Sequence, residues 1–183
     1  NGQMLWTQAT GSGVLAAPIT VTVGDQQILL VTVGSPALVR SAMVAYGVSR
    51  ESRGPSRIMA FALGGAGKIP KVDTSLPKID EPPKIEASKA TLQSGANLYN
   101  SGSCWLCHGD RADSIGGSAP DLRRSPIIKS KDAWFSVVVK GALKGGGMLG
   151  QDFSPDDAEA IRAFVVEQAW KEYRQVKSEE KRK

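Results

Sequence analysis

The stretch SGSCWLCHGD, residues 101–110, contains both cysteines and the only histidine of this 183-residue chain. Cys104, Cys107 and His108 follow the spacing Cys-x-x-Cys-His. Because the chain places its whole supply of cysteine and histidine in five consecutive positions, the stretch indicates one shared chemical task. We then expect the surrounding chain to fold so that it holds this short segment in place.

The spacing is the attachment pattern of a c-type haem. Each thiol of such a pattern adds across one haem vinyl group to form a thioether, and the histidine that follows supplies the proximal imidazole to the iron. The sequence therefore predicts covalent attachment of haem through Cys104 and Cys107, and ligation of its iron by His108.

Three other interpretations stay open for the same residues. A structural zinc site needs four ligands, usually cysteine or histidine, and this chain has three such residues in total. A redox-active dithiol lies beside a strand that opens a helix, whereas the residues before Cys104 read as helix and those after it as loop. A plain disulfide in a structural or adhesion module would be redox-silent and would give no Soret band.

Haem iron also needs a second axial ligand, and with a single histidine in the chain we expect it to be a methionine sulfur. Met4 and Met59 lie in strand-like runs and Met43 in an apolar stretch, where core packing is the usual role. Met148 lies instead in the glycine-rich segment GALKGGGMLGQDF, whose flexible backbone can bring a thioether to the haem. We predict Met148 as the distal ligand, with an exposed loop methionine as the alternative.

The segment GGSAPDLRRSP supplies candidates for support of the site. A ligating imidazole donates its second N–H to a fixed acceptor, and the carbonyl of Pro120 is the predicted acceptor. The alternative is an ordinary loop proline. Arg123 or Arg124 is predicted to pair with the haem propionates, and a solvated surface charge is the equal alternative for each.

Residues 1–66 carry strand patterns. The stretch APITVTVGDQQILLVTVG alternates apolar and other residues on both sides of Gly24-Asp25, which predicts a hairpin with a two-residue turn. The run RIMAFALGG, from Arg57 to Gly65, predicts a further strand that ends at paired glycines. An antiparallel β segment is therefore expected at this end of the chain.

Residues 67–87 are rich in proline and charge, which predicts a semi-rigid linker and a domain boundary. From residue 88 to residue 176 the apolar period becomes helical. Helices are predicted from Ser88 to Asn100, from the N-cap Ser130 to Gly141, and from the N-cap Ser154 onward. The apolar face of the last helix is predicted to comprise Ile161, Phe164, Val165 and Ala169. Residues 177–183 form a charged tail that is expected to be solvated or disordered.

Composition limits the partners of the chain. The formal charge of +5 and the pI near 9.3 suit an acidic partner, and no Lys/Arg stripe interleaved with aromatic residues indicates nucleic-acid binding. No apolar run approaches the length of about 18 residues that a membrane-spanning helix needs. Because the first residue is Asn1, we expect a mature form or a fragment.

The second half resembles the class I c-type cytochromes. The resemblance covers about residues 88–174 and rests on GANLYNSGSCWLCHG, APDLRRSP and GGGMLGQDFSPDDAEAIRAFV. In that family the first and last helices cross at a small residue and an aromatic, and Gly95 with Tyr99 matches, facing Phe164. The resemblance implies an all-α fold around one haem.

The first half resembles the last blade of the propeller of pyrroloquinoline quinone (PQQ) dependent alcohol dehydrogenases. Its Gly2 to Trp6 matches the Gly-x-x-x-Trp docking element of that family, whose quinohaemoprotein branch continues through a proline-rich linker into a cytochrome c domain. The glycine-rich loop that approaches the quinone in the family reads Gly34-Ser35-Pro36-Ala37 here, so no quinone contact is assigned. The expected fold is therefore mixed: an incomplete β-propeller blade followed by an all-α class I cytochrome c domain.

The two resemblances together imply a function in electron transfer. The haem would accept electrons from the PQQ of a periplasmic alcohol dehydrogenase propeller and pass them to an external acceptor, either a small redox protein or a quinone-linked oxidase. PQQ and calcium would be held by the remaining blades, so this chain alone is expected to transfer electrons without oxidising alcohol. A stand-alone periplasmic electron carrier with a β appendage is the alternative.

Overall fold

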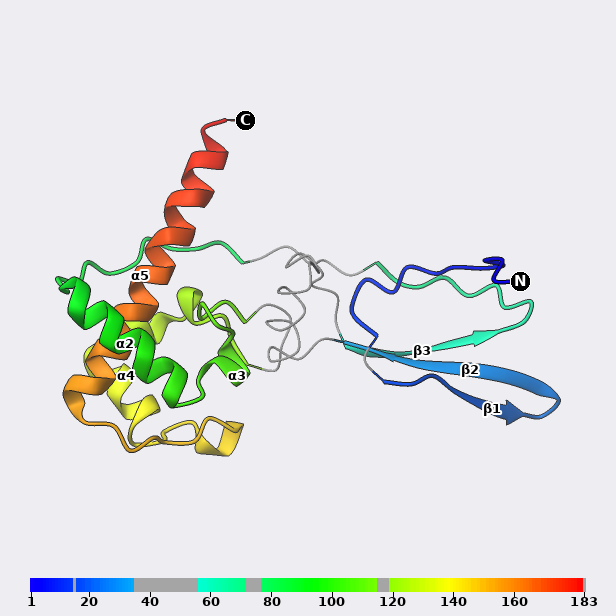
Figure 1. Cartoon of the computed structure of the whole chain (residues 1–183), viewed down its shortest axis with the longest axis horizontal. Helices are drawn as coiled ribbons and strands as arrows, with labels where there is room; N and C mark the ends of the chain where they lie inside the picture. The colour runs from blue at the N-terminus through cyan, green and yellow to red at the C-terminus, as the bar shows by residue number, and fades with distance from the viewer. Residues whose placement is uncertain (15, 35–55, 72–76, 115–118, 183) are drawn as a thin grey trace. The chain divides into compact units, whose positions relative to one another are not determined.

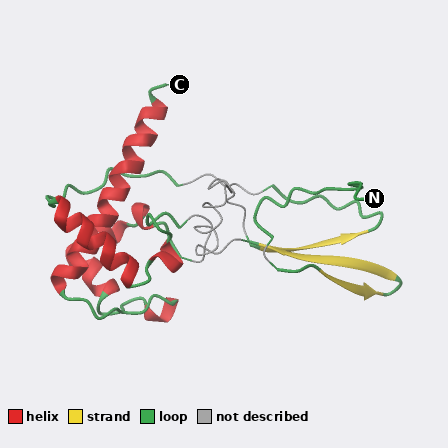
Figure 2. Cartoon of the chain, viewed as in Figure 1, coloured by secondary structure: helices red, strands yellow, loops and turns green. Residues whose placement is uncertain are grey.

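The computed structural model describes residues 1–14, 16–34, 56–71, 77–114 and 119–182. The chain divides into two compact units, Asn1–Ser75 and Leu76–Lys183. Figures 1 and 2 show strands and loops in the first unit and helices in the second. Met43 and positions 35–37 of the loop compared with the quinone-site loop lie outside the described residues.

The first unit contains a three-stranded antiparallel sheet in the order β1-β2-β3. Its strands are β1 (Ile19–Val23), β2 (Gln26–Val33) and β3 (Arg57–Ala62). Val23 pairs with Gln26, so Gly24-Asp25 is the two-residue turn of the hairpin, and Gly24 has a φ of 58° that favours glycine. The predicted hairpin and the strand after Arg57 are confirmed.

The core of the first unit is small. Val31, Val33 and Met59 are buried, and a hollow of about 1090 Å³ is lined in part by Trp6 and Phe61, whose rings meet edge to face. Many large apolar side chains are exposed instead: Met4, Leu5, Trp6, Val14, Ile19, Val21, Val23, Ile58 and Leu63.

The expectation of core packing holds for Met59 and is wrong for Met4. Met59 is 5% exposed, whereas Met4 is 78% exposed. Residues 1–10 form no strand, so no ladder fixes Met4 against the sheet.

The second unit is helical. Its α-helices are α2 (Lys89–Ser101), α3 (Trp105–His108), α4 (Lys131–Val138) and α5 (Pro155–Glu180), and its 3₁₀ helices are η1 (Leu122–Arg124), η2 (Pro126–Lys129) and η3 (Lys144–Gly146). The predicted N-caps Ser130 and Ser154 each accept a hydrogen bond from the backbone N–H three residues on, and Ser88, at the predicted start of the first helix, does the same. The helix that begins after Ser130 ends at Val138, three residues before the predicted stop at Gly141.

The contact between α2 and α5 is the main packing interface of the second unit. A Cβ at Gly95 would collide with the backbone oxygen of Ala160, so only glycine lets the two backbones approach this closely. Next to the crossing, the rings of Tyr99 and Phe164 lie 5.2 Å apart. Ile161, Val165 and Ala169 are buried beside them. The sequence-based prediction of this crossing is confirmed.

Residues 77–87, which we call the strap, belong to the second unit and pack against its helices, although they were predicted as linker. Ile79 is buried, and Ile85 packs against the helical core. The indole Nε1 of Trp170 donates to the carbonyl of Pro83 at 3.0 Å, and Lys129 pairs with Asp80. This part of the proline-rich segment is therefore anchored at several points.

Lys177–Glu180, the first part of the predicted charged tail, forms the last turn of α5. Lys177 and Glu180 form an ion pair with each other. Among the residues that the structure describes, no helix has the length and apolar character needed to cross a membrane. The predicted fold class, an antiparallel β segment followed by an all-α domain, is confirmed. The boundaries assigned to blade, linker, domain and tail stay a prediction.

Candidate haem-binding site

The Cys-x-x-Cys-His segment forms one helical turn. Residues after Cys104 were expected to be loop, but Trp105–His108 is helix α3, and the N–H of His108 bonds to the carbonyl of Cys104 at 2.9 Å. On a helix, positions i, i+3 and i+4 share one face. The single turn therefore presents Cys104, Cys107 and His108 to the same side.

The chain enters this turn through a tight bend. Helix α2 ends at Ser101, the N–H of Gly102 bonds to the carbonyl of Leu98 at 2.8 Å, and Ser103 has a φ of 57°. A Cβ at Gly102 would lie 2.7 Å from the ring of Phe153. The first cysteine is thus placed directly beside the end of α2.

Both thiols are free, with Cys104 partly buried and Cys107 exposed. Burial, with a smaller contribution from Cys107, raises the pKa of Cys104 to about 11. Reactive dithiols instead carry a cysteine whose pKa is lowered by a nearby positive charge or a helix N-terminus. The environment of Cys104 therefore does not favour a thioredoxin-like function.

His108 is held as a neutral imidazole. Its side chain is 6% exposed, and its Nδ1 lies 3.0 Å from the carbonyl oxygen of Pro120. Since a carbonyl only accepts, Nδ1 carries the proton and Nε2 keeps its lone pair. Burial lowers the pKa of His108, although the Pro120 carbonyl opposes that effect. A neutral ring with one fixed N–H is the form that ligates iron.

The loop after His108 is fixed by buried polar contacts. Tyr99 donates its hydroxyl to the carbonyl of Gly109 at 2.7 Å, and burial raises the pKa of Tyr99, which keeps that hydroxyl protonated. Gly109 has a φ of 78°, and a Cβ there would lie 2.6 Å from a carboxylate oxygen of Asp113. Position 109 therefore requires glycine.

Met148 is half-buried rather than fully exposed. It follows η3 and Gly147, whose φ is 94°, and its N–H bonds to the carbonyl of Leu143. Its side chain packs against the same hydrophobic core as Cys104 and Trp105. The predicted distal ligand and the attachment turn thus border one core.

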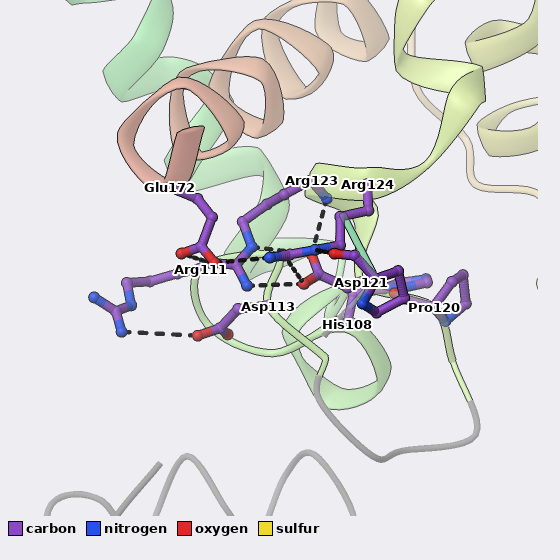
Figure 3. A network of polar contacts seen from close by, with 9 residues as sticks. His108, Arg111, Asp113, Pro120, Asp121, Arg123, Arg124 and Glu172 are labelled. Atoms are coloured by element: carbon purple, nitrogen blue, oxygen red, sulfur yellow. Dashed lines mark hydrogen bonds and ion pairs between the residues drawn. The ribbon is translucent and has the colours of Figure 1, made fainter. Parts of the chain in front are cut away.

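Arg123 and Arg124 belong to a buried ion-pair network, which we call the arginine cluster: Asp121, Arg123, Arg124 and Glu172 (Figure 3). All three guanidinium nitrogens of Arg123 donate to the carboxylates of Asp121 and Glu172, at 2.8–3.0 Å. Arg123 is 8% exposed, so it is not a solvated surface charge. Its assignment to a haem propionate stays a prediction.

Sequence reasoning missed Asp121 and Glu172. The position of Asp121 directly before Leu122-Arg123-Arg124 is a helix-capping signal, and its carboxylate does accept from the N–H of Arg123. No sequence signal pairs Arg123 with Glu172, which lies 49 residues away on α5.

The second unit matches a known cytochrome family. Residues 90–165 fit the sequence family described as cytochrome C oxidase, cbb3-type, subunit III, which is a cytochrome c domain. The match begins within α2, includes the Cys-x-x-Cys-His turn and Met148, and ends within α5.

Full-length relatives match nearly the whole chain. Lupanine 17-hydroxylase (cytochrome c) of Pseudomonas sp is 35% identical over 178 residues, which are 94% of this chain and 25% of that protein. The dehydrogenase subunit of alcohol dehydrogenase (quinone) from Acetobacter aceti is 33% identical over 92% of this chain and 23% of its own length.

A solved structure matches as well. That of quinohaemoprotein alcohol dehydrogenase ADHIIG from Pseudomonas putida HK5 superposes with a TM-score of 0.70 and 27% identity, covering 92% of this chain and 24% of that one. The chain spans about a quarter of the length of the relatives it matches.

Proposed function

The chain is homologous to quinohaemoprotein alcohol dehydrogenases and carries a cytochrome c domain, and we propose that it is the electron-exporting part of such an enzyme. The second unit would take electrons one at a time from the quinone cofactor of the parent enzyme. It would then deliver them to an external acceptor.

The residues of the second unit are suited to defined tasks. We assign attachment to Cys104 and Cys107, the proximal ligand to Nε2 of His108 and the distal ligand to the sulfur of Met148. A c-type haem, when bound, supplies one-electron chemistry at its iron. The chain itself fixes the imidazole tautomer through Pro120 and keeps the ring neutral by burial.

The observation that carries this proposal is the hydrogen bond of 3.0 Å between His108 Nδ1 and the Pro120 carbonyl. It leaves the lone pair of Nε2 available on the turn that also bears both free thiols. A zinc-ligating histidine would gain from the same hydrogen bond, but among the described residues no group of three or more His, Cys, Asp or Glu side chains could hold a metal ion.

The first unit supports membership of a larger protein. Its sheet leaves Ile19, Val23 and Ile58 exposed, as an isolated blade would. We propose that the remaining blades of the parent chain cover these side chains and hold PQQ and calcium. On this assignment the chain alone oxidises no alcohol. An acidic redox protein or a quinone-linked oxidase in the periplasm is the proposed acceptor, because the chain has a net charge of +5.

The axial ligand is testable by optical spectroscopy. The chain, secreted from a host with a haem-maturation system, should be red and low-spin. Met148→Ala should keep the haem covalently attached and lose the sulfur-to-iron absorption at the far-red end of the spectrum. Met4→Ala, at an exposed methionine of the first unit, is the matched control and should keep that band.

Replacing Cys104 and Cys107 together by Ala should make the haem extractable with acidified organic solvent. A far-red band that survives in Met148→Ala contradicts the ligand assignment. A colourless wild-type chain contradicts the proposed function as a whole.

A further inference from the structure

We propose that the arginine cluster is a positioning device for His108: it fixes the direction of the Pro120 carbonyl and thereby the strength of the hydrogen bond to the imidazole. This inference rests on the proposed function, since its consequence is a set reduction potential of the haem. Nothing in the ligand pattern itself requires two arginines and two carboxylates at this place. The contacts within the cluster and its covalent link to Pro120 carry the argument.

The cluster is saturated with charge-assisted hydrogen bonds. The Asp121 carboxylate accepts from the N–H, Nε and Nη2 of Arg123 and from Nη1 of Arg124, at 2.7–3.0 Å. Glu172 accepts from both arginines, at 3.0 and 2.8 Å. Two positive and two negative side chains therefore alternate in a compact group, and none is more than 18% exposed.

Removing one member would leave an uncompensated buried charge. Burial alone lowers the pKa of Arg123, but the hydrogen bond and charge of Asp121, with the charge of Glu172, raise it above its ordinary value. Buried ion pairs add little net stability against an apolar replacement, yet breaking one is costly. Such a group is better suited to holding one conformation than to adding stability.

The conformation that the cluster holds includes the Pro120 carbonyl. The peptide bond is planar, so the Pro120 carbonyl, the Asp121 nitrogen and the Asp121 Cα move as one rigid plane. Asp121 has φ −66° and ψ 107°, and its side chain is anchored in the cluster. A rotation of Asp121 would swing the carbonyl away from His108 Nδ1.

The cluster also joins three separate segments at this point. Glu172 belongs to α5, Arg123 and Arg124 to η1, and Arg124 donates through Nε to the carbonyl of Pro77 in the strap at 2.9 Å. Figure 3 shows the cluster beside His108 and Pro120. The Pro120 carbonyl, which accepts from the imidazole, is thus held in place through contacts with α5, the longest helix of the domain, rather than by its own loop alone.

The test uses the haem-loaded full chain with Asp121→Asn. A weakened hydrogen bond makes the imidazole a poorer donor to the oxidised iron. The ratio of reduced to oxidised haem at a fixed solution potential should rise about tenfold, which corresponds to ~59 mV for one electron. The His108 Nδ1 proton, followed by NMR in the diamagnetic reduced protein, should exchange with solvent about tenfold faster.

Glu159→Gln is the matched control. Glu159 lies on α5, as Glu172 does, and forms a bidentate pair with a buried arginine, Arg162. Arg162 donates to the carbonyl of Ile128 and not to the loop after His108. It should leave the redox ratio and the Nδ1 exchange rate within twofold of wild type. The exchange rate separates orientation from charge, because loss of a charge alone shifts the potential without exposing the Nδ1 proton.

Equal redox ratios and exchange rates in Asp121→Asn and Glu159→Gln would overturn the inference, as would a shifted ratio with unchanged exchange. If Asp121→Asn does not accumulate as a folded haem protein, Glu172→Gln decides with the same two measurements, and it should shift both in the same direction by a smaller factor. These outcomes presuppose covalent haem in the wild type. A wild type without haem would instead contradict the proposed function.

Discussion

The two units of the chain meet the requirement to bury apolar surface in different ways. The helical unit closes around its own core, in which Tyr99, Ile161 and Val165 are almost completely buried. Among its described residues, the sheet unit buries the apolar side chains of Val31, Val33 and Met59, and it leaves Ile58, Leu63 and Trp6 largely exposed. A short sheet cannot cover its own edges and second face. On the proposed function, neighbouring blades cover the exposed side chains of the first unit, whereas the second unit packs around a core of its own.

The largest effect on this comparison is expected from a substitution at Gly95 that disrupts the core of the helical unit. In Gly95→Val the new Cβ would lie 2.6 Å from the carbonyl carbon of Ala160 and 3.1 Å from the Cβ of Phe164, so α2 and α5 must separate. Overpacking of this kind costs about 3 kcal/mol. Denaturant unfolding followed by helical circular dichroism should show that loss.

Gly145→Ala is the control for this substitution, because nothing lies within 4 Å of a Cβ at that position. Its unfolding midpoint should match that of wild type. A tolerated valine at position 95 would mean that the crossing is not the basis of the second unit's stability.

A smaller effect is expected from acidification of the helical unit. Burial opposes ionisation of Glu159, but the hydrogen bond and charge of Arg162 outweigh it and lower the pKa of the carboxyl. A lowered folded-state pKa gives stability that is present above the ordinary carboxyl pKa and is lost as pH falls through the folded value. Glu159→Gln should cost about 1–2 kcal/mol near neutral pH, less than for a fully buried pair because Glu159 is partly exposed.

The difference in unfolding free energy between Glu159→Gln and wild type should narrow as the pH falls below the ordinary carboxyl pKa and through the lowered folded-state pKa of Glu159. Thermal unfolding of both proteins as the pH is lowered measures it. If the stability difference between the two proteins stayed constant as the pH fell, the contribution of Glu159 would not come from its ionised form.

The smallest effect is expected at Ile58, on the exposed face of the sheet, and Met59 on the opposite face is its comparison. Ile58 and Met59 are neighbours on β3, and they are 72% and 5% exposed. Ile58→Thr should leave the free energy of unfolding within about 0.5 kcal/mol, whereas Met59→Thr should destabilise the sheet by about 2 kcal/mol. Amide hydrogen exchange in β2 and β3, which reports on the sheet separately from the helical unit, compares the two variants. Equal losses would indicate that the Ile58 face is covered within this chain.

Local signals in the sequence were sufficient for much of the fold. The caps at Ser130 and Ser154 and the Gly24-Asp25 turn depend on contacts within a few residues, so they follow from the residue types alone. The Pro120 acceptor could be predicted because a ligating imidazole requires one near it. The Gly95–Tyr99 pair was expected instead from the resemblance to the class I c-type cytochromes.

The remainder depends on contacts that are distant along the chain. Proline composition indicated a spacer, but the fixed positions of Pro77 and Pro83 depend on Arg124 and Trp170, 47 and 87 residues away. Met4 is exposed because residues 1–10 do not pair with the sheet. Strand-like composition does not determine whether a segment pairs. The pairing of Arg123 with Glu172 is hidden for the same reason.

The acceptor of His108 is a main-chain carbonyl, while the side chain of Pro120 itself is exposed. Every amino acid carries such a carbonyl, so no point mutation at position 120 can delete the oxygen. On the proposed ligation of iron by His108, substitutions near position 120 alter the surroundings of the iron in graded steps, by shifting the backbone slightly. A lineage would retune its electron carrier in this way without passing through a form that has lost the acceptor of the imidazole.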